Sequence, residues 1–534
     1  MTEHSAIDPV TLEVLRNQLE SVAEEMGQTL IRGAYSPNIK ERRDCSTALF
    51  DAEGRMIAQA EHIPVHLGAM PAAVDAVLEC DPEPGDVFVL NDPFAGGTHL
   101  PDVTMVSPLA VGTAGRANEC DEDGENSAEI VGYAVSRAHH ADVGGMTPGS
   151  MPAGAQEIYQ EGLRIPPTRL VAGGETRADV RSLILANVRN PRERRADLRA
   201  QQAANERASE RLESLFAEHG RDTVLEGFSA VIDYSRERIE SELEALPDGT
   251  YRATDVLEGD GVTDEDIEIC ATVTVDGATL EVDFAGTADQ LAGNCNAPLS
   301  VAQSAVYFVV RCLTDPEIPP NEGCYDPVSV HAPEGSLLNP EPPAAVVGGN
   351  VETSQRVTDV VFAALAQAAP DRVPAQGQGT MNNLTIGGRD GSFTYYETIG
   401  GGFGARSDRD GMDGVQVGMT NTLNTPVESL EAEYPLRVER YALREGSGGR
   451  GRHRGGMGIE RSVTLESDAT VSLLTERRRH APKGVDGGEN GAVGENLIDG
   501  ETVPAKTTLD VEAGTTVTVR TPGGGGHGDP EKSQ

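Results

Sequence analysis

Cysteine is scarce in this sequence, and long apolar runs are absent. Seven cysteines are scattered over 534 residues, none of them in a CxxC pair, which argues against a disulfide framework and a zinc knuckle. Free thiols are typical of a reducing compartment. No stretch approaches the ~18 uninterrupted apolar residues of a membrane-spanning helix, and residues 1–15 do not resemble a secretory signal. We therefore expect a cytoplasmic protein without a membrane partner.

Lysine is also rare, and acid outweighs base. The only lysines are Lys40, Lys483, Lys506 and Lys532, whereas the chain has 86 acidic residues and a formal net charge of −43. Nucleic-acid binding depends on basic patches, so this composition argues against a nucleic-acid partner. The acid is spread along the whole chain, which favours adaptation to high salt over an acidic binding face. We therefore expect a halophilic source, and the charge says little about mechanism.

Three common catalytic motifs are missing. The pattern GxxxxGK[ST] does not occur, so the sequence has no P-loop for nucleotide phosphates. The segment 400–404 reads GGGFG rather than GxGxxG after a strand, which argues against a dinucleotide-binding fold. The serine-hydrolase motif GxSxG is absent as well.

The order of sequence patterns predicts a mixed α/β (α+β) fold in four regions. Asp8-Pro9 should begin a helix that ends near Gly33, because apolar residues then recur at helical spacing. Strand-like segments follow up to residue 136, and residues 112–129 should form an exposed hairpin extension. The predicted regions are an N-terminal α/β region with a metal site (1–175), a helical segment in which Pro191 starts or kinks a helix (176–248), a mixed α/β region (249–430) and a β-rich, glycine-rich region (431–534).

Two loops that follow strand-like segments combine histidine and aspartate. One reads GGTHLPDV and carries His99 and Asp102, and the other reads AHHADVGG and carries His139, His140 and Asp142. Nitrogen and oxygen ligands converging from turns are typical of metal sites. Side chains alternate across a strand, so only one of the two adjacent histidines can face such a site.

The spacing alone does not force these loops together. If the strands on either side of residues 112–129 pair as an antiparallel hairpin, we expect the two loops to lie at opposite ends unless one ligand lies within a strand. Structurally satisfied histidines and a metal site are therefore equally compatible with the pattern.

Two further groups leave alternatives open. His62 and His66 could share a helix face, but Pro64 between them favours a loop or a strand. Glu41 and Asp44 are flanked by Lys40, Arg42 and Arg43, which indicates either an exposed ion-pair cluster or a carboxylate ligand held by arginines.

Many longer motifs, in order and in register, resemble the hydantoinase B/oxoprolinase family. They include DPVTLEVLRNQL, SPNIKERRDCSTALFD, GDVFVLNDPFAGGTHLPDVTMVSP, SRAHHADVGGMTPGSMP, NVRNPRERRADLRAQQAA, GGNVETSQRVTDV and PGGGGHGDP. The resemblance runs from about residue 7 to residue 530.

This resemblance implies one half of a two-part enzyme. The partner would be a hydantoinase A-type subunit with an actin-like ATPase fold, which binds ATP and phosphorylates the carbonyl oxygen of a cyclic amide. The substrate would be a small molecule such as 5-oxoproline or an N-methylhydantoin, and water would then open the ring. The implied assembly is a hetero-oligomer.

Related acetone and acetophenone carboxylases imply the site residues. Carried onto this chain, the resemblance gives a divalent metal (Mn²⁺, Zn²⁺ or Fe²⁺) and favours His139 over His140. Asp142 is implied as a general base or as an orienting group, and Asp102 as both a ligand and a catalytic residue. The implied metal ligands are His99, Asp102, His139 and Glu41, and the implied substrate or fold contacts are Asp92, Glu352, Arg356 and Arg406. Alternative functions are the large subunit of an ATP-dependent ketone carboxylase and a non-catalytic scaffold for the ATPase.

Overall fold

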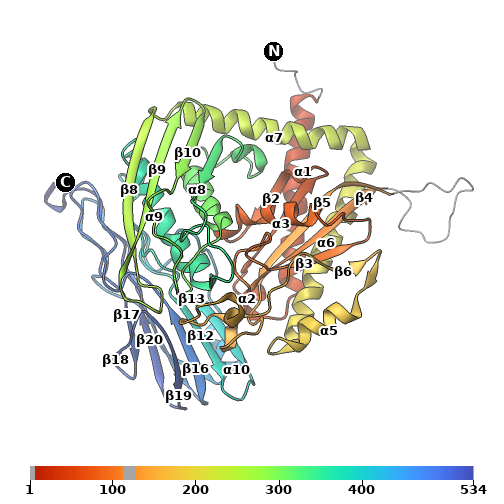
Figure 1. Cartoon of the computed structure of the whole chain (residues 1–534). Coiled ribbons are helices and arrows are strands. Elements are labelled where there is room, and N and C mark those ends of the chain that lie inside the picture. Colours follow the sequence, from red (N-terminus) through yellow and green to blue (C-terminus); the bar gives the residue numbers. More distant parts are fainter. Residues whose placement is uncertain (1–6, 112–127, 533–534) are drawn as a thin grey trace, which may run out of the picture.

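A seven-stranded sheet forms the N-terminal part of the computed structural model, which describes residues 7–111 and 128–532 (Figure 1). The strand order is β2-β1-β5-β4-β3-β6-β7, and the pairings are antiparallel. The extension predicted for residues 112–129 lies outside the described residues, apart from its last two. The strands are β1 (Cys45–Asp51), β2 (Met56–Glu61), β3 (Val87–Leu90), β4 (Asp102–Val111), β5 (Glu129–His139), β6 (Thr168–Ala172) and β7 (Glu175–Thr176).

Helices cover both faces of this sheet. α1 (Pro9–Gly33) and α6 (Pro191–His219) pack on one face, and α3 (Ala69–Leu78) packs on the other. Side-chain alternation along β1 separates the two cores: Leu49 is buried with α1 and α6, whereas Phe50 is buried with α3.

The predicted N-terminal helix is confirmed. The Asp8 carboxylate accepts hydrogen bonds from the backbone N–H groups of Val10 (3.0 Å) and Thr11 (3.2 Å), which satisfies two N–H groups that the first turn leaves unpaired. The helix runs to Gly33, and its predicted apolar stripe is buried from Leu15 to Leu30. Pro191 starts α6, as the sequence also indicated.

The remaining elements form three smaller sheets with their helices. The second sheet contains β8 (Gly249–Glu258), β9 (Asp266–Asp276), β10 (Thr279–Asp283) and β11 (Val328–His331). The third contains β12 (Asn383–Gly388), β13 (Thr394–Thr398), β16 (Ala469–Leu474) and β19 (Lys506–Val511). The fourth contains β14 (Leu436–Leu443), β15 (Ile459–Leu465), β17 (Glu495–Ile498), β18 (Glu501–Thr502) and β20 (Thr516–Arg520). The other helices are α2 (Pro37–Lys40), α4 (Ile158–Glu161), α5 (Ala178–Ala186), α7 (Arg221–Glu244), α8 (Leu299–Leu313), α9 (Ser354–Leu365) and α10 (Val427–Glu433).

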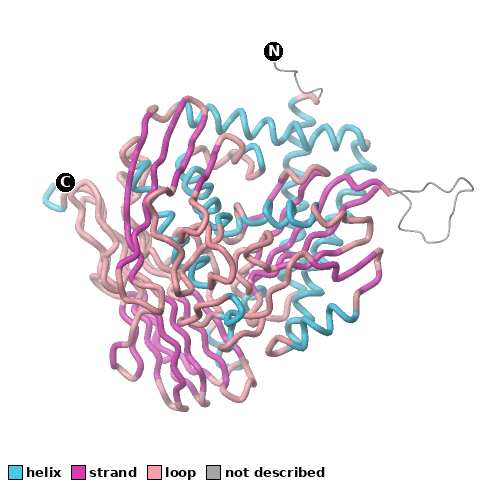
Figure 2. The backbone as a smooth tube through the Cα atoms, viewed as in Figure 1, coloured by secondary structure: helices cyan, strands magenta, loops and turns pink. Residues whose placement is uncertain are grey.

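The predicted mixed α/β fold class is confirmed. The largest hydrophobic core joins side chains between residues 48 and 474, including α8, α9 and one face of the first sheet. Loops and turns are concentrated between the sheets (Figure 2). Among the described helices, none is long and apolar enough to cross a membrane.

Glu161 at the end of α4 gives a pH-dependent prediction. Its Oε1 accepts the backbone N–H groups of Val346 and Val347, both at 2.9 Å, and burial raises the pKa of its carboxyl to about 8. Between the unfolded pKa of ~4.3 and about 8, only the unfolded chain releases the proton, so this group lowers stability as the pH rises. Glu161→Gln keeps the acceptor and should raise Tm by about 2 °C at pH 8 but not at pH 4.5.

Differential scanning fluorimetry at the two pH values would measure this effect. Glu334→Gln makes the same chemical change at an exposed position and should leave Tm unchanged at both. An equal Tm for Glu161→Gln and the parent protein at pH 8 would contradict the explanation.

The net charge of −43 predicts that salt stabilises the fold. Raising KCl from 0.1 M to 1 M shortens the Debye length from ~10 Å to ~3 Å and screens the repulsion between carboxylates. We expect Tm to rise by about 5 °C or more, measured in KCl because sulfate would also strengthen apolar burial. A flat or falling Tm over this range would argue against salt adaptation.

A candidate metal site at the open end of a hairpin

The side chain of Asn91 anchors the loop that carries His99. The Asn91 side-chain amide donates to Leu100 O (2.8 Å) and Leu163 O (3.0 Å). Gly97 packs so closely that a Cβ atom there would lie 2.5 Å from Asn91 O, which explains the glycine in the GGTHLPDV motif. The loop is therefore fixed before any ligand binds.

The pairing of β4 with β5 brings the two motifs together. Asp102 is the first residue of β4 and His139 is the last residue of β5, and they are directly opposite partners in the register. The expectation that the loops lie at opposite ends of the hairpin is therefore wrong. In an antiparallel pair the start of one strand adjoins the end of the next, and both motifs lie at that open end.

Asp102 lies between three histidine side chains. Its Oδ2 is 3.2 Å from His99 Nδ1 and 3.3 Å from His66 Nε2, and its Oδ1 is 3.2 Å from His139 Nδ1. All four side chains are buried. The ligand atoms of His99, Asp102 and His139 lie within 4.8 Å of one another, so two imidazoles and a carboxylate converge from two strand ends.

The protonation states and the free donor atoms fit a divalent metal. Burial lowers the pKa of His99. Burial alone would raise the pKa of Asp102, but the surrounding imidazoles, His99 first, hold it well below its usual value. Within the described part of the chain, both ring nitrogens of His99 and Nε2 of His139 are buried without a hydrogen-bond partner. Neutral imidazoles and an ionised carboxylate are the forms that bind Mn²⁺, Zn²⁺ or Fe²⁺.

The cavity beside this group is small. Its volume is about 20 Å³, which is enough for one water-sized occupant but not for an organic ring. It therefore suits a metal ion, and an organic ligand would have to reach that ion from a neighbouring space.

His140 points away from the cavity. Its Nε2 lies 2.9 Å from Gln201 Oε1 on α6, and burial lowers the pKa of its imidazole to about 4. Alternation along β5 thus places His139 in the candidate site and His140 in the interface with α6.

His66 is the residue of this cluster that the sequence pattern did not assign. Pro64 begins a 3₁₀ turn, Pro64–His66, which turns the imidazole towards Asp102. Its Nδ1 lies 2.9 Å from Ser46 Oγ. Because an ionised carboxylate can only accept, Nε2–H of His66 donates to Asp102 and the serine hydroxyl donates to Nδ1. The proline in HIPVH was the available signal, since it excludes the shared helix face.

Tyr396 of β13 forms one wall of the cavity. Its ring stacks on His139, with centroids 4.6 Å apart and planes inclined by 14°. Its hydroxyl donates to Asn383 Oδ1 (2.8 Å), and Asn383 Nδ2 donates to Glu352 Oε1 (2.8 Å). The buried Arg42 guanidinium donates to Tyr396 O (2.6 Å) and lies over its ring. The orientation of His139 is thus set by residues far away in the sequence.

Of the two acidic residues near position 42, the structure places Asp44 at the cavity. Asp44 is buried and lines it, and Asp44 O accepts the backbone N–H of His139 (3.0 Å). Glu41 is half-buried just after α2 and is not among the described residues that line the cavity. Because Arg42 and Asp44 are both buried, they are not part of an exposed ion-pair cluster.

Asp142 is fully engaged outside the cavity. Its Oδ1 accepts the backbone N–H groups of Gly144 and Arg189, each at 2.9 Å. Its Oδ2 accepts Gly149 N (2.9 Å) and Arg189 Nη1 (3.0 Å). Four donors occupy both of its oxygens, so this carboxylate holds the loop that follows β5.

The other predicted contacts are dispersed. Asp92 accepts Phe94 N (3.1 Å) and pairs with Arg164. Buried Arg356 pairs with Asp359 (2.7 Å). Burial raises the pKa of Glu352 to about 8, and its Oε1 accepts hydrogen bonds from Asn383 Nδ2 (2.8 Å) and from the backbone N–H of Met381 (3.1 Å), which lines the cavity. Arg406 is half-exposed and lines a second, larger cavity.

The fold and this group of side chains define a mixed α/β protein with a candidate metal site. The chain belongs to the hydantoinase B/oxoprolinase family, whose model matches residues 8–530. It is 42% identical to an uncharacterised protein of Methanocaldococcus jannaschii, over 98% of this chain and 91% of the other. It is 33% identical to a Pseudomonas protein named as a D-/L-hydantoinase subunit, over 99% of this chain and 91% of the other.

The similarity also extends to a longer protein. The identity to 5-oxoprolinase 1 of Arabidopsis thaliana is 39% over 98% of this chain, but this chain spans only 42% of that protein's length.

Two solved structures share the fold. The ATP-dependent caprolactamase of Pseudomonas jessenii matches with a TM-score of 0.89 and 31% identity, over 99% of this chain and 92% of the other. A nucleotide-free acetone carboxylase matches with a TM-score of 0.86, over 100% of this chain and 77% of the other. Its identity is 18%, so this likeness concerns the fold alone.

Proposed function

We propose that this chain is the metal-binding subunit of an ATP-dependent cyclic-amide hydrolase. The observation that carries the proposal is the buried His99–Asp102–His139 group in a chain of this family. The caprolactamase, 31% identical, supports a lactam or a related cyclic amide as the substrate. The chain spans 42% of Arabidopsis 5-oxoprolinase, which supports an ATP-dependent step on a separate, hydantoinase A-type subunit.

The reaction needs two contributions because an unstrained amide carbonyl is a poor electrophile. The partner would transfer the γ-phosphate of ATP to the carbonyl oxygen. Water would then attack the carbon, the C–N bond would break, and hydrolysis would release the phosphate. A divalent metal bound at this group would supply Lewis-acid polarisation or a water of lowered pKa.

This chain's own side chains would orient the site and accept the proton. The Asp102 carboxylate accepts a hydrogen bond from His139 Nδ1 (3.2 Å) and lies 3.2 Å from His99 Nδ1. Stacking by Tyr396 restricts the His139 ring further. Asp44, which lines the cavity, would take a proton from the attacking water. Asp142 does not suit that role because four donors already bind it.

Reconstitution with an A-type ATPase subunit in high salt tests the proposal. With ATP, we expect 5-oxoproline, N-methylhydantoin or caprolactam to give a ring-opened product together with ADP and inorganic phosphate. A chelator should abolish turnover, and Mn²⁺, Zn²⁺ or Fe²⁺ should restore it.

The same assay separates the alternatives. Carboxylation of acetone with bicarbonate, without amide opening, would favour the ketone carboxylase. Full amide opening after complete removal of metal would favour a scaffold role for this chain.

A further inference from the structure

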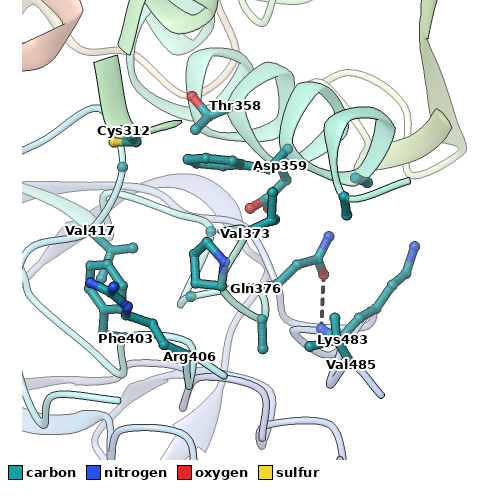
Figure 3. Close-up of a pocket in the computed structure, with 18 of the residues that line it drawn as sticks. Cys312, Thr358, Asp359, Val373, Gln376, Phe403, Arg406, Val417, Lys483 and Val485 are labelled. Carbon is teal, nitrogen blue, oxygen red and sulfur yellow. Dashed lines mark hydrogen bonds between the residues drawn. The ribbon is translucent and has the colours of Figure 1, made fainter. Parts of the chain in front are cut away.

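A second cavity, of about 360 Å³, lies beside α9 (Figure 3). We call it the α9 chamber. Thr358 and Asp359 on α9 form one wall, and the loops that carry Phe403, Arg406 and Lys483 form the facing walls. Its apolar lining includes Phe308, Phe362, Phe403, Val373, Val417 and Val485. This volume and lining are typical of small-molecule sites.

The charge of the α9 chamber is opposite to that of the protein. Acidic residues outnumber basic residues 86 to 43 in the whole chain. Among the described residues that line the chamber, however, Arg372, Arg406 and Lys483 face a single acid, Asp359. That acid is already neutralised, because its Oδ2 accepts Arg356 Nη1 (2.7 Å) and Arg477 Nη2 (2.6 Å). A cationic chamber in a strongly acidic protein indicates an anionic ligand.

The three cationic side chains have donors to spare. Each is about half exposed and has one loosely placed carboxylate partner: Glu242 at 3.6 Å from Arg372, Asp408 at 3.3 Å from Arg406, and Asp255 at 3.4 Å from Lys483. Arginine offers several N–H groups in a fork that fits a carboxylate or a phosphate.

The chamber adjoins the His99–Asp102–His139 cavity. Two loops line both spaces: Gly379 and Gly418 line the chamber, and Met381 and Thr420, two residues further on, line the smaller cavity. Two residues of extended chain span at most ~7 Å, so the linings of the two spaces lie within that distance along each loop. The helical segment that begins at Gly349 likewise lines the smaller cavity and then, as α9, the chamber.

We propose that the α9 chamber binds a small anionic molecule with an apolar ring or chain, whose anionic group is held by Arg372, Arg406 and Lys483. The apolar lining receives the body of the molecule, because the cavity next to it, of about 20 Å³, has room for only one water-sized occupant. If the proposed function is correct, the ligand is the activated, phosphate-bearing amide or the ring-opened product, because amide hydrolysis creates a carboxylate. Binding itself does not depend on that reaction.

The chain contains no tryptophan, so a single tryptophan would report on the chamber without background. Phe403 is half-buried and lines the chamber, and Phe403→Trp is therefore the reporter variant. Phenylacetate, phenyl phosphate and the neutral phenylacetamide serve as probes, titrated into the metal-free chain alone at fixed salt. We expect saturable fluorescence changes with the anions and an affinity at least about tenfold lower for the amide. The first two probes distinguish a carboxylate ligand from a phosphate ligand.

Arg406→Gln in the reporter background should weaken binding of the preferred anion at least about tenfold. Arg409→Gln removes the same charge three residues away, at an exposed position outside the chamber lining, and should leave the affinity unchanged. Phe362→Trp provides a second reporter if the first variant does not fold, as judged by circular dichroism.

Equal affinities for the amide and the anions, no saturable binding, or equal effects of the two arginine variants would overturn the proposal. The titration uses neither metal nor the ATPase, so its result does not depend on the reaction. If the chamber binds the anions but the reconstituted complex does not open the amide, the proposed function is rejected and the proposed anion site is retained.

Discussion

Asp102→Asn should abolish stable metal binding and reduce ring opening by about 1000-fold, since a bound metal contributes several kcal/mol to transition-state stabilisation. The carboxylate contacts His66, His99 and His139. An amide in its place loses the negative charge, and its NH₂ group would face an imidazole N–H, of His66 or of His139, that now donates to the carboxylate. We expect the bound metal, measured by elemental analysis, to fall from stoichiometric to below about one-tenth, because the affinity should drop at least about 100-fold.

Asp142→Asn is the matched control, because this carboxylate is equally buried and contacts no histidine of the cluster. It should keep the metal. Its stability should fall by about 1–3 kcal/mol, since two of the four donors would then face the NH₂ group of the asparagine instead of an oxygen. Metal retained by Asp102→Asn, or lost by Asp142→Asn while the fold is intact, would contradict the assignment.

His139→Ala and His140→Ala should have opposite effects on metal content and stability. His139→Ala removes an imidazole of the candidate site, so metal and turnover should both be lost. His140→Ala leaves the site intact but removes the partner of Gln201 at 2.9 Å. It should retain metal and lose about 1–3 kcal/mol of stability.

Elemental analysis and thermal unfolding of the two variants, side by side, measure this difference. Each variant acts as the control for the other, because the residues are adjacent and the truncation is identical. If His140→Ala loses the metal and His139→Ala retains it, the assignment of His139 rather than His140 to the site is wrong.

Some features of the site could be predicted from local sequence. His99 and Asp102 lie three residues apart in a glycine-rich turn, and alternation along β5 allows only one of His139 and His140 into the site. The convergence of the two motifs could also have been inferred, because a residue before one strand of a hairpin lies beside the residue that ends the next.

Other features have no local signal. His66 reaches Asp102 from a separate turn, and Tyr396 stacks on His139 from a strand more than 250 residues further along the chain. The pattern KERRD did not reveal that Asp44 lines the cavity and Glu41 does not. The α9 chamber combines α8, α9 and several distant loops, and its cationic character is invisible in a chain whose overall charge is −43.

The sequence by itself determined the helix that Asp8 caps, strands β1 to β5 of the first sheet, the mixed α/β class and the family, because caps, periodicity and long motifs depend on neighbouring residues. Only the tertiary structure decided which side chains face one another in the two cavities. The burial energy that joins distant segments is non-directional, so the register and the packing of the whole chain fix those contacts.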